Sequence, residues 1–154
     1  MNIEKQIAKI LTKKKLTLAV AESCTGGLIS NNITDIPGSS KFFKGGIVAY
    51  SNDIKTFFLN VPGTIIKKYG AVSGEVAISM AVGARKAMDT DIAVSITGIA
   101  GPTGGTKEKP IGLAYLAFSS EEKNAGRKVL VKGNRSQMKE QFAKAALNLI
   151  LKCI

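Results

Sequence analysis

Histidine is missing from the sequence, and its absence removes whole classes of catalytic and metal sites. A Ser-His-Asp triad cannot be built, because histidine is the general base of that arrangement. Zinc sites rely mainly on histidine and cysteine, and the only cysteines, Cys24 and Cys153, stand near opposite ends of the chain. We therefore expect no metal, and a hydrolase built on this chain must use lysine or a carboxylate as its base.

Disulfides, membrane spans and signal peptides are equally unsupported. The two cysteines form neither a Cys-x-x-Cys pair nor a framework of four or more. No apolar run approaches the roughly 20 residues that a membrane helix needs, and residues 1–9 are charged and periodic, unlike the core of a signal peptide. These features predict a cytoplasmic protein with no membrane contact.

Arginine is also scarce, since Arg85, Arg127 and Arg135 are the only ones, although the formal net charge is +11. Arginine forks onto phosphates and base edges, whereas scattered lysines are typical of a solvated surface. No basic run extends beyond Lys13–Lys15. We therefore expect no nucleic-acid partner, and attraction of small anionic substrates by this charge is a hypothesis.

A length of 154 residues with 45% hydrophobic content predicts a single domain over residues 1–154. Hydrophobic periodicity and turn residues predict strands and helices that alternate along most of the chain. This alternation predicts a three-layer α/β/α sandwich with a mixed, mostly parallel sheet of about five strands, the last two forming an antiparallel hairpin. The expected strands are 17–21, 46–50, 92–96, 111–118 and 127–132, and the expected helices are 2–14, 28–33, one after Ser51 or Asn52, a turn at 64–69, 73–88 and one from 136.

Ligands bind such folds outside the carboxyl ends of the strands, where Ser23, Ser51, Thr97 and Gly98 should gather. Ser23 stands between a predicted strand and a glycine-rich helix start. Its hydroxyl would lie near the free N–H groups of the first helical turn, which suit an oxyanion. The alternative is that Ser23 and Thr25 only cap the helix.

Lys55 is a candidate base only if it is desolvated, because a free lysine has a pKa near 10.4. Lowering this pKa to about 7 requires roughly 4 to 5 kcal/mol of destabilisation of the ammonium, which burial among Phe57, Phe58 or Ile54 could supply. The alternative is a surface lysine paired with Asp53 or Asp89.

Two further side chains and one loop have both a plain and a functional interpretation. Tyr50 fits either a core aromatic or a site residue, and Arg135 fits either a surface charge or a phosphate anchor beside a helix start. The glycine-rich segment 98–105 is either a long turn or a loop lining the substrate site. It matches neither the P-loop nor the Gly-x-Gly-x-x-Gly pattern.

Several ordered motifs together resemble the CinA carboxy-terminal domain family, over about residues 3 to 150. The motifs that carry the resemblance are Ala21-Glu22-Ser23-Cys24-Thr25-Gly26-Gly27, Gly38-Ser39-Ser40, Tyr50-Ser51-Asn52 with Lys55, Gly70-Ala71-Val72-Ser73, Thr97-Gly98-Ile99-Ala100-Gly101-Pro102 with Gly104-Gly105, and Lys109-Pro110-Ile111-Gly112.

The resemblance implies a nicotinamide-nucleotide amidase, which hydrolyses nicotinamide mononucleotide to nicotinate mononucleotide and ammonia with a Ser/Lys pair and no metal or cofactor. Carried onto this sequence, it makes Ser23 the nucleophile, Lys55 the base, Tyr50 a proton relay and Arg135 the phosphate anchor. The remaining residues expected to bind substrate are Cys24, Thr25, Gly26, Gly27, Ser40, Thr97 and Gly98.

Some features depart from the family or leave alternatives open. Gly133-Asn134-Arg135 replaces the commoner Gly-Asp-Arg and so loses one carboxylate, and the chain resembles the stand-alone amidase rather than the larger CinA proteins. Ser51, four residues before Lys55, is an alternative nucleophile. A non-catalytic nucleotide sensor or a DNA-associated accessory domain is the alternative function. The pairs Phe42-Phe43 and Phe57-Phe58 fit a homo-oligomer or core packing equally well.

Overall fold

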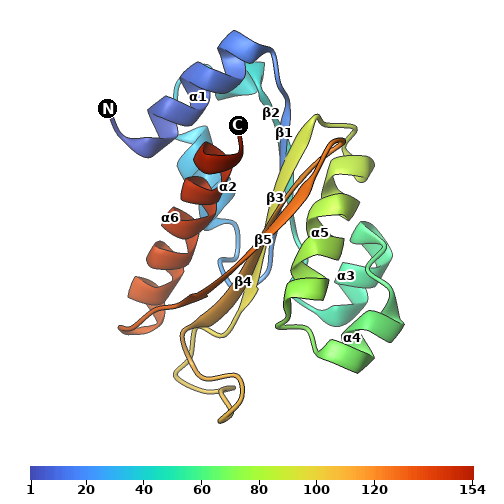
Figure 1. Cartoon of the computed structure of the whole chain (residues 1–154). Helices are drawn as coiled ribbons and strands as arrows, with labels where there is room; N and C mark the ends of the chain where they lie inside the picture. Colours follow the sequence, from blue (N-terminus) through green and yellow to red (C-terminus); the bar gives the residue numbers. More distant parts are fainter.

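A five-stranded sheet runs through the middle of the computed structural model, which describes residues 1–154, in the order β2-β1-β3-β4-β5 (Figure 1). β1 pairs in parallel with both β2 and β3, whereas β4 is antiparallel to both β3 and β5. β4 alone therefore opposes the other strands, which confirms the mixed sheet and its final hairpin. The strands are β1 (Leu18–Glu22), β2 (Phe43–Val48), β3 (Ile92–Gly98), β4 (Leu113–Ser120) and β5 (Asn124–Leu130).

Helices cover both faces of the sheet and complete the predicted α/β/α sandwich (Figure 1). One face carries α1 (Ile3–Lys14), α2 (Leu28–Thr34) and α6 (Arg135–Cys153), and the other carries α3 (Asn52–Leu59), α4 (Gly63–Tyr69) and α5 (Gly74–Ala87). A short 3₁₀ turn, Ser39–Lys41, precedes β2. None of these helices combines the length and the apolar character that crossing a bilayer demands.

The two faces of the sheet differ in side-chain size. Leu18 and Val20 of β1 belong to the large core under α1, α2 and α6, whereas Ala19 and Ala21 face the opposite layer. This alternation follows from the two-residue period of a strand. Within the second layer, α5 and α3 pack closely at Gly83, where a Cβ would lie 1.9 Å from the carbonyl oxygen of Leu59.

Most strand boundaries lie one or two residues from the sequence prediction, but β2 and β5 each begin three residues earlier than predicted. β2 begins at Phe43 rather than 46, although glycines at 45 and 46 disfavour a strand. Gly46 is needed there, since a Cβ would lie 2.3 Å from the Ser30 hydroxyl oxygen of α2. β5 begins at Asn124 rather than 127, because a tight turn, with Ser120 N–H donating to the Lys123 carbonyl at 2.8 Å, lets pairing start at once.

Candidate active site

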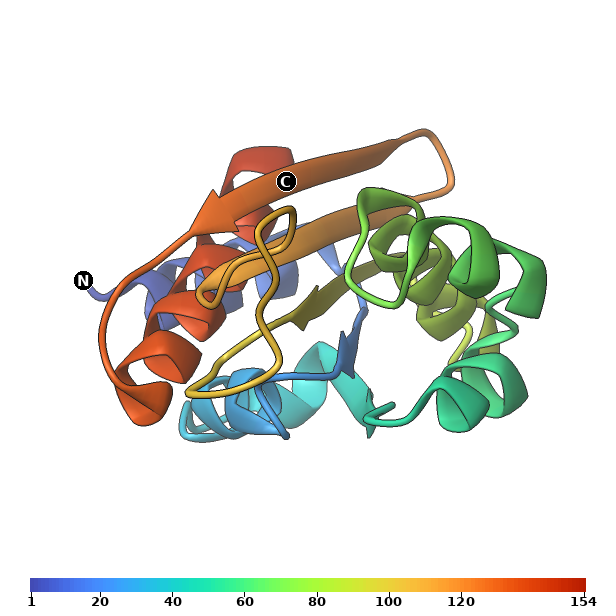
Figure 2. The same cartoon turned by 90° about the horizontal axis from the view of Figure 1, so that it is seen from below.

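The carboxyl ends of β1 and β3 meet at one edge of the sheet and form a cavity of about 340 Å³. Ser23 directly follows β1, Thr97 and Gly98 end β3, and Tyr50 follows β2, as the topology predicted. The loop between β3 and β4 crosses this end of the molecule (Figure 2). The cavity is lined by Ser23, Cys24, Tyr50, Asn52, Lys55, Ala71, Val72, Thr97, Gly98, Ile99, Ala100, Gly101, Thr103, Gly104 and Arg135.

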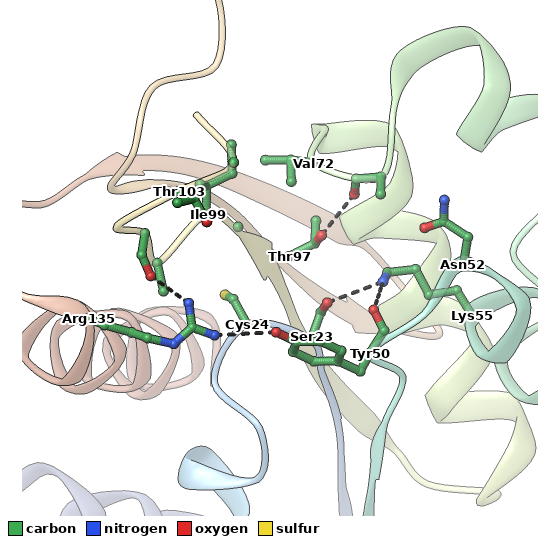
Figure 3. A pocket seen from close by; sticks show the side chains of 15 residues that line it. Ser23, Cys24, Tyr50, Asn52, Lys55, Val72, Thr97, Ile99, Thr103 and Arg135 are labelled. Carbon is green, nitrogen blue, oxygen red and sulfur yellow. Dashed lines mark hydrogen bonds between the residues drawn. The ribbon is translucent and has the colours of Figure 1, made fainter. Parts of the chain in front are cut away.

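Ser23 and Lys55 form a buried pair inside this cavity (Figure 3). Lys55 Nζ lies 3.2 Å from Ser23 Oγ and 3.2 Å from the carbonyl oxygen of Tyr50. Lys55 is only 1% exposed, and burial lowers the pKa of its ammonium. Both acceptors are uncharged, so the lysine is held without a carboxylate that would keep it protonated.

The placement of Lys55 follows from how α3 begins and what it buries. Ser51 caps the helix, its hydroxyl accepting the N–H of the first turn at 3.3 Å, and is itself exposed. Lys55 and Leu59, four residues apart, are the buried residues of α3. Phe57 and Phe58 are 76% and 50% exposed, so the expectation that they desolvate Lys55 is wrong. Phe57 follows Lys55 by two positions and so points to another side of the helix, whereas Phe58, three positions on, lies near the Lys55 face but is itself half exposed.

The alternative nucleophile Ser51 is not supported by this geometry. Its hydroxyl is engaged as the α3 cap and does not line the cavity. Lys55 Nζ bonds to Ser23 instead. The serine 32 positions away is therefore the one that the fold presents to the lysine.

The turn after Ser23 provides a candidate oxyanion site. Cys24 lines the cavity, and its backbone N–H donates to no other residue, whereas Gly26 N–H donates to the Ser23 carbonyl at 3.1 Å. Burial raises the pKa of the Cys24 thiol to about 12, so this thiol stays protonated beside Ser23. Free donors after a nucleophile are the usual means of holding a tetrahedral oxyanion.

Thr25, Gly26 and Gly27 do not line the cavity as the substrate-binding prediction required. Gly26 and Gly27 adopt φ values of +60° and +104°, which glycine tolerates best, and so they shape the turn behind Ser23. The hydroxyl of Thr25 donates to the Glu22 carboxylate at 2.6 Å. These residues shape the turn that carries Ser23 rather than contact the cavity.

Sequence reasoning missed Glu22, a fully buried carboxylate directly before Ser23. Its oxygens accept the N–H groups of Ile29 at 2.9 Å and Ser30 at 3.0 Å, and the Ser30 hydroxyl at 2.8 Å. The α2 N-cap itself, Gly27, makes no side-chain bond, so the interpretation of Ser23 and Thr25 as caps is wrong. The helix dipole favours a carboxylate near a helix start. The position of Glu22 shortly before the predicted helix could therefore have indicated its role from the sequence.

Arg135 and Tyr50 bond to each other across the cavity mouth (Figure 3). Arg135 donates to the Tyr50 hydroxyl at 3.3 Å and to the Gly101 carbonyl at 2.6 Å. Tyr50 is 62% exposed, which rules out a core aromatic. Lys55 meets the carbonyl of Tyr50 rather than its hydroxyl, so the proton-relay role remains a prediction.

Asn134 explains how the chain tolerates the loss of the commoner aspartate. Its side-chain oxygen accepts the N–H of Gln137 at 2.9 Å, and Gln137 accepts the Asn134 N–H in return at 2.9 Å. Asparagine and aspartate cap helices about equally well. The turn that presents Arg135 therefore survives the substitution.

The segment 98–105 lines the cavity, which favours the substrate-lining interpretation over a plain turn. Thr97 also lines it, with its hydroxyl donating to the Ala71 carbonyl at 2.8 Å. This bond brings the loop before α5, including Val72, to the cavity wall. In the sequence, this loop belongs to the motif Gly70-Ala71-Val72-Ser73, to which the family resemblance assigned no role.

Ser40 is the one predicted site residue that the fold places elsewhere. It lies exposed in the 3₁₀ turn before β2, and the cavity lies past the opposite end of that strand. Six residues of strand span about 20 Å, too far for a shared ligand contact. The substrate-binding prediction for Ser40 is therefore corrected for this cavity.

No group of three or more Asp, Glu or Cys side chains gathers in a way that could hold a metal ion. The polar side chains that line the cavity are those of Ser23, Tyr50, Asn52, Lys55, Thr97, Thr103 and Arg135.

The fold and the buried pair define an α/β/α domain with a serine–lysine site at the carboxyl ends of its parallel strands. The CinA C-terminal domain family model matches residues 1–154, and the chain belongs to this family. A CinA-like protein of Dictyoglomus thermophilum is 49% identical over 138 residues, covering 90% of this chain and 34% of the relative. A putative competence-damage inducible protein of Thermoanaerobacter pseudethanolicus is 47% identical over 148 residues, which cover 96% of this chain and 36% of the relative.

Solved structures agree with the fold. The competence/damage inducible protein CihA of Agrobacterium tumefaciens has a TM-score of 0.95 and 36% identity, with 97% of this chain and 92% of that chain covered. A CinA superfamily protein of Escherichia coli has a TM-score of 0.96 and 29% identity, with 99% and 89% covered. The chain thus spans about a third of the length of the curated relatives and most of the solved chains.

Proposed function

We propose that this chain is an amidohydrolase that deamidates nicotinamide mononucleotide to nicotinate mononucleotide and ammonia. The observation that carries the proposal is the 3.2 Å contact between Ser23 Oγ and the Nζ of a lysine that is 1% exposed. Burial favours the neutral amine, which can accept the hydroxyl proton. Histidine, the usual base, is absent from the chain.

In the first half of the reaction, Ser23 Oγ attacks the carboxamide carbon while Lys55 Nζ takes its proton. The N–H of Cys24, which donates to no other residue, holds the developing oxyanion. Collapse of the tetrahedral intermediate breaks the C–N bond, and Lys55 returns the proton to the leaving nitrogen, which departs as ammonia.

In the second half, water attacks the acyl-enzyme as Lys55 takes one of its protons. The intermediate collapses to nicotinate mononucleotide, and Lys55 gives the proton back to Ser23 Oγ. Arg135, which reaches over the cavity from the start of α6, would contact the phosphate of the substrate. Tyr50, bonded to Arg135, would order the same end of the substrate.

The test is mass-spectrometric detection of nicotinate mononucleotide, with ammonia release, after incubation of nicotinamide mononucleotide without added metal. Wild type should form product, and Ser23→Ala should lose at least about a hundredfold in rate, since the nucleophile is removed. Ser51→Ala is the matched control and should keep its rate, because Ser51 only caps α3. Equal losses in the two variants would contradict the assignment of the nucleophile.

The relatives named as competence-damage inducible leave a second candidate, an accessory domain that acts near DNA without catalysis. A net charge of +11 is compatible with it. An inert wild type across pH and salt, together with salt-dependent duplex binding near physiological ionic strength, would favour this candidate over the amidase.

A further inference from the structure

A second hollow lies beside the catalytic cavity and shares Arg135 with it. It has a volume of about 400 Å³ and lies between the starts of α2 and α6, which pack against each other. Its lining is Leu28, Arg135, Ser136, Lys139 and Glu140. Because Arg135 lines both spaces, a ligand in the cavity that contacts this side chain lies next to the hollow.

Lys139 is a cation of this hollow that has no bonding partner in the protein. It follows Arg135 by four residues, so both side chains lie on the same face of α6. Lys139 is half-buried, and a Cβ at Gly26 would lie 3.6 Å from its Nζ. Its ammonium donates to no protein acceptor, unlike Arg135, which bonds to Gly101 and Tyr50. Its positive charge nevertheless reaches the Cys24 thiol, beside the nucleophile.

The surroundings of Lys139 favour an anion. The first turn of α6 contains no acidic residue, and its leading N–H groups add a partial positive charge. Ser136 offers a hydroxyl. Glu140 is the one carboxylate of the lining and opposes the two cations only in part. Gly26 presents no side chain to the Lys139 ammonium.

We propose that this hollow is a subsite for a phosphate monoester, bound between Lys139 and Arg135, so that Lys139 makes the enzyme select nucleotides over nucleosides. A phosphate monoester carries a charge near −2 at neutral pH, which two cations match better than one. A phosphodiester carries only one negative charge, which two cations match less well. The inference rests on the proposed function for its substrate, but its binding test does not require hydrolysis.

The kinetic test compares nicotinamide mononucleotide with nicotinamide riboside, which lacks the phosphate, in wild type, Lys139→Met and Lys144→Met. Lys139→Met should raise KM for the nucleotide about tenfold or more, as expected for loss of a charge-assisted hydrogen bond, and leave the riboside reaction unchanged. Lys139→Arg should restore most of the affinity. Lys144, exposed farther along α6, is the matched control for loss of one charge and should behave as wild type.

The binding test uses calorimetry on Ser23→Ala, with nicotinamide mononucleotide and ribose 5-phosphate as probes. Adding Lys139→Met should weaken both, and adding Glu140→Gln should tighten both, because it removes the opposing carboxylate. Binding with this pattern but no hydrolysis by wild type would sustain the subsite and refute the amidase. Equal effects of Lys139→Met and Lys144→Met, equal losses for nucleotide and riboside, or no binding of either probe would overturn the subsite.

Discussion

Replacing Lys55 with methionine separates what the lysine contributes to catalysis from what it costs the fold. Methionine is similar in length and apolar, so it can occupy the same buried space between Ser23 and α5. It cannot accept the proton of the Ser23 hydroxyl at the 3.2 Å contact. A positioned general base contributes about 10²–10⁴ to the rate, so kcat should fall by that factor with little change in KM.

The effect on stability has two parts of opposite sign. Burying the ammonium of Lys55, 1% exposed, lowers its pKa below 10.5, and each unit corresponds to about 1.4 kcal/mol lost from the folded state when the lysine is protonated. Methionine removes that cost, but leaves the Tyr50 carbonyl without its donor, which costs about 1–3 kcal/mol if the carbonyl stays dry. The dependence on pH distinguishes these parts.

The pKa of Lys55 is lower in the folded chain than in the unfolded chain. Between the two values the unfolded chain holds a proton that the folded chain lacks, so the stability of wild type rises as pH rises toward 10.5. Lys55→Met lacks this titration, and the groups common to both proteins cancel in the comparison. The free energy of unfolding of wild type relative to the variant should therefore increase from pH 7 to pH 10.

The two measurements are urea unfolding of both proteins at pH 7 and pH 10, and deamidation rates over the same range. The wild-type rate should also fall on acidification through the lowered pKa of Lys55, because the protonated amine cannot act as a base. A stability difference that stays flat between pH 7 and pH 10, or a variant with a rate within tenfold of wild type, would refute the assignment of Lys55 as a desolvated base.

Three further predictions follow from the packing around the site. Glu22→Gln should lower the free energy of unfolding by about 1–3 kcal/mol and reduce kcat, because the buried carboxylate accepts four hydrogen bonds; a urea midpoint equal to that of wild type would contradict this. At pH 8 a thiol reagent should label Cys153 well before Cys24, whose pKa is about 12; two equally fast equivalents would argue against the burial of Cys24. Gly83→Ala should lower the melting temperature, since its Cβ would lie 1.9 Å from a carbonyl oxygen of α3, whereas Gly63→Ala, with open space around it, should not.

The element order was predictable from sequence because hydrophobic period and turn residues agree over most of the chain. Boundaries failed where packing overrides local preference. The two glycines of β2 resemble a loop until Ser30 of α2 is known to lie against Gly46. The polar start of β5 resembles a connection, because an edge strand with an exposed side needs few apolar residues.

Only the site residues at the carboxyl ends of the parallel strands could be placed from the sequence. Ser23 and Thr97 follow or end parallel neighbours, so the topology alone brings them together. The bond between Arg135 and Tyr50 joins residues 85 positions apart and has no local signal. Ser40 belongs to a family motif, but motif membership says nothing about which end of β2 it occupies.

The burial of Lys55 depends on three small strand residues to which the sequence gives no functional signal. Ala19 and Ala21 of β1 and Ala93 of β3 form the floor on which Leu59 of α3 and the helix α5 pack. Larger side chains there would hold α3 away from the sheet by the width of the added atoms. Because Lys55 is carried by α3 and Ser23 by the end of β1, the 3.2 Å between their side-chain atoms depends on this small-residue face. The alanines therefore set the distance on which the proposed proton transfer depends, although none of these three lines the cavity.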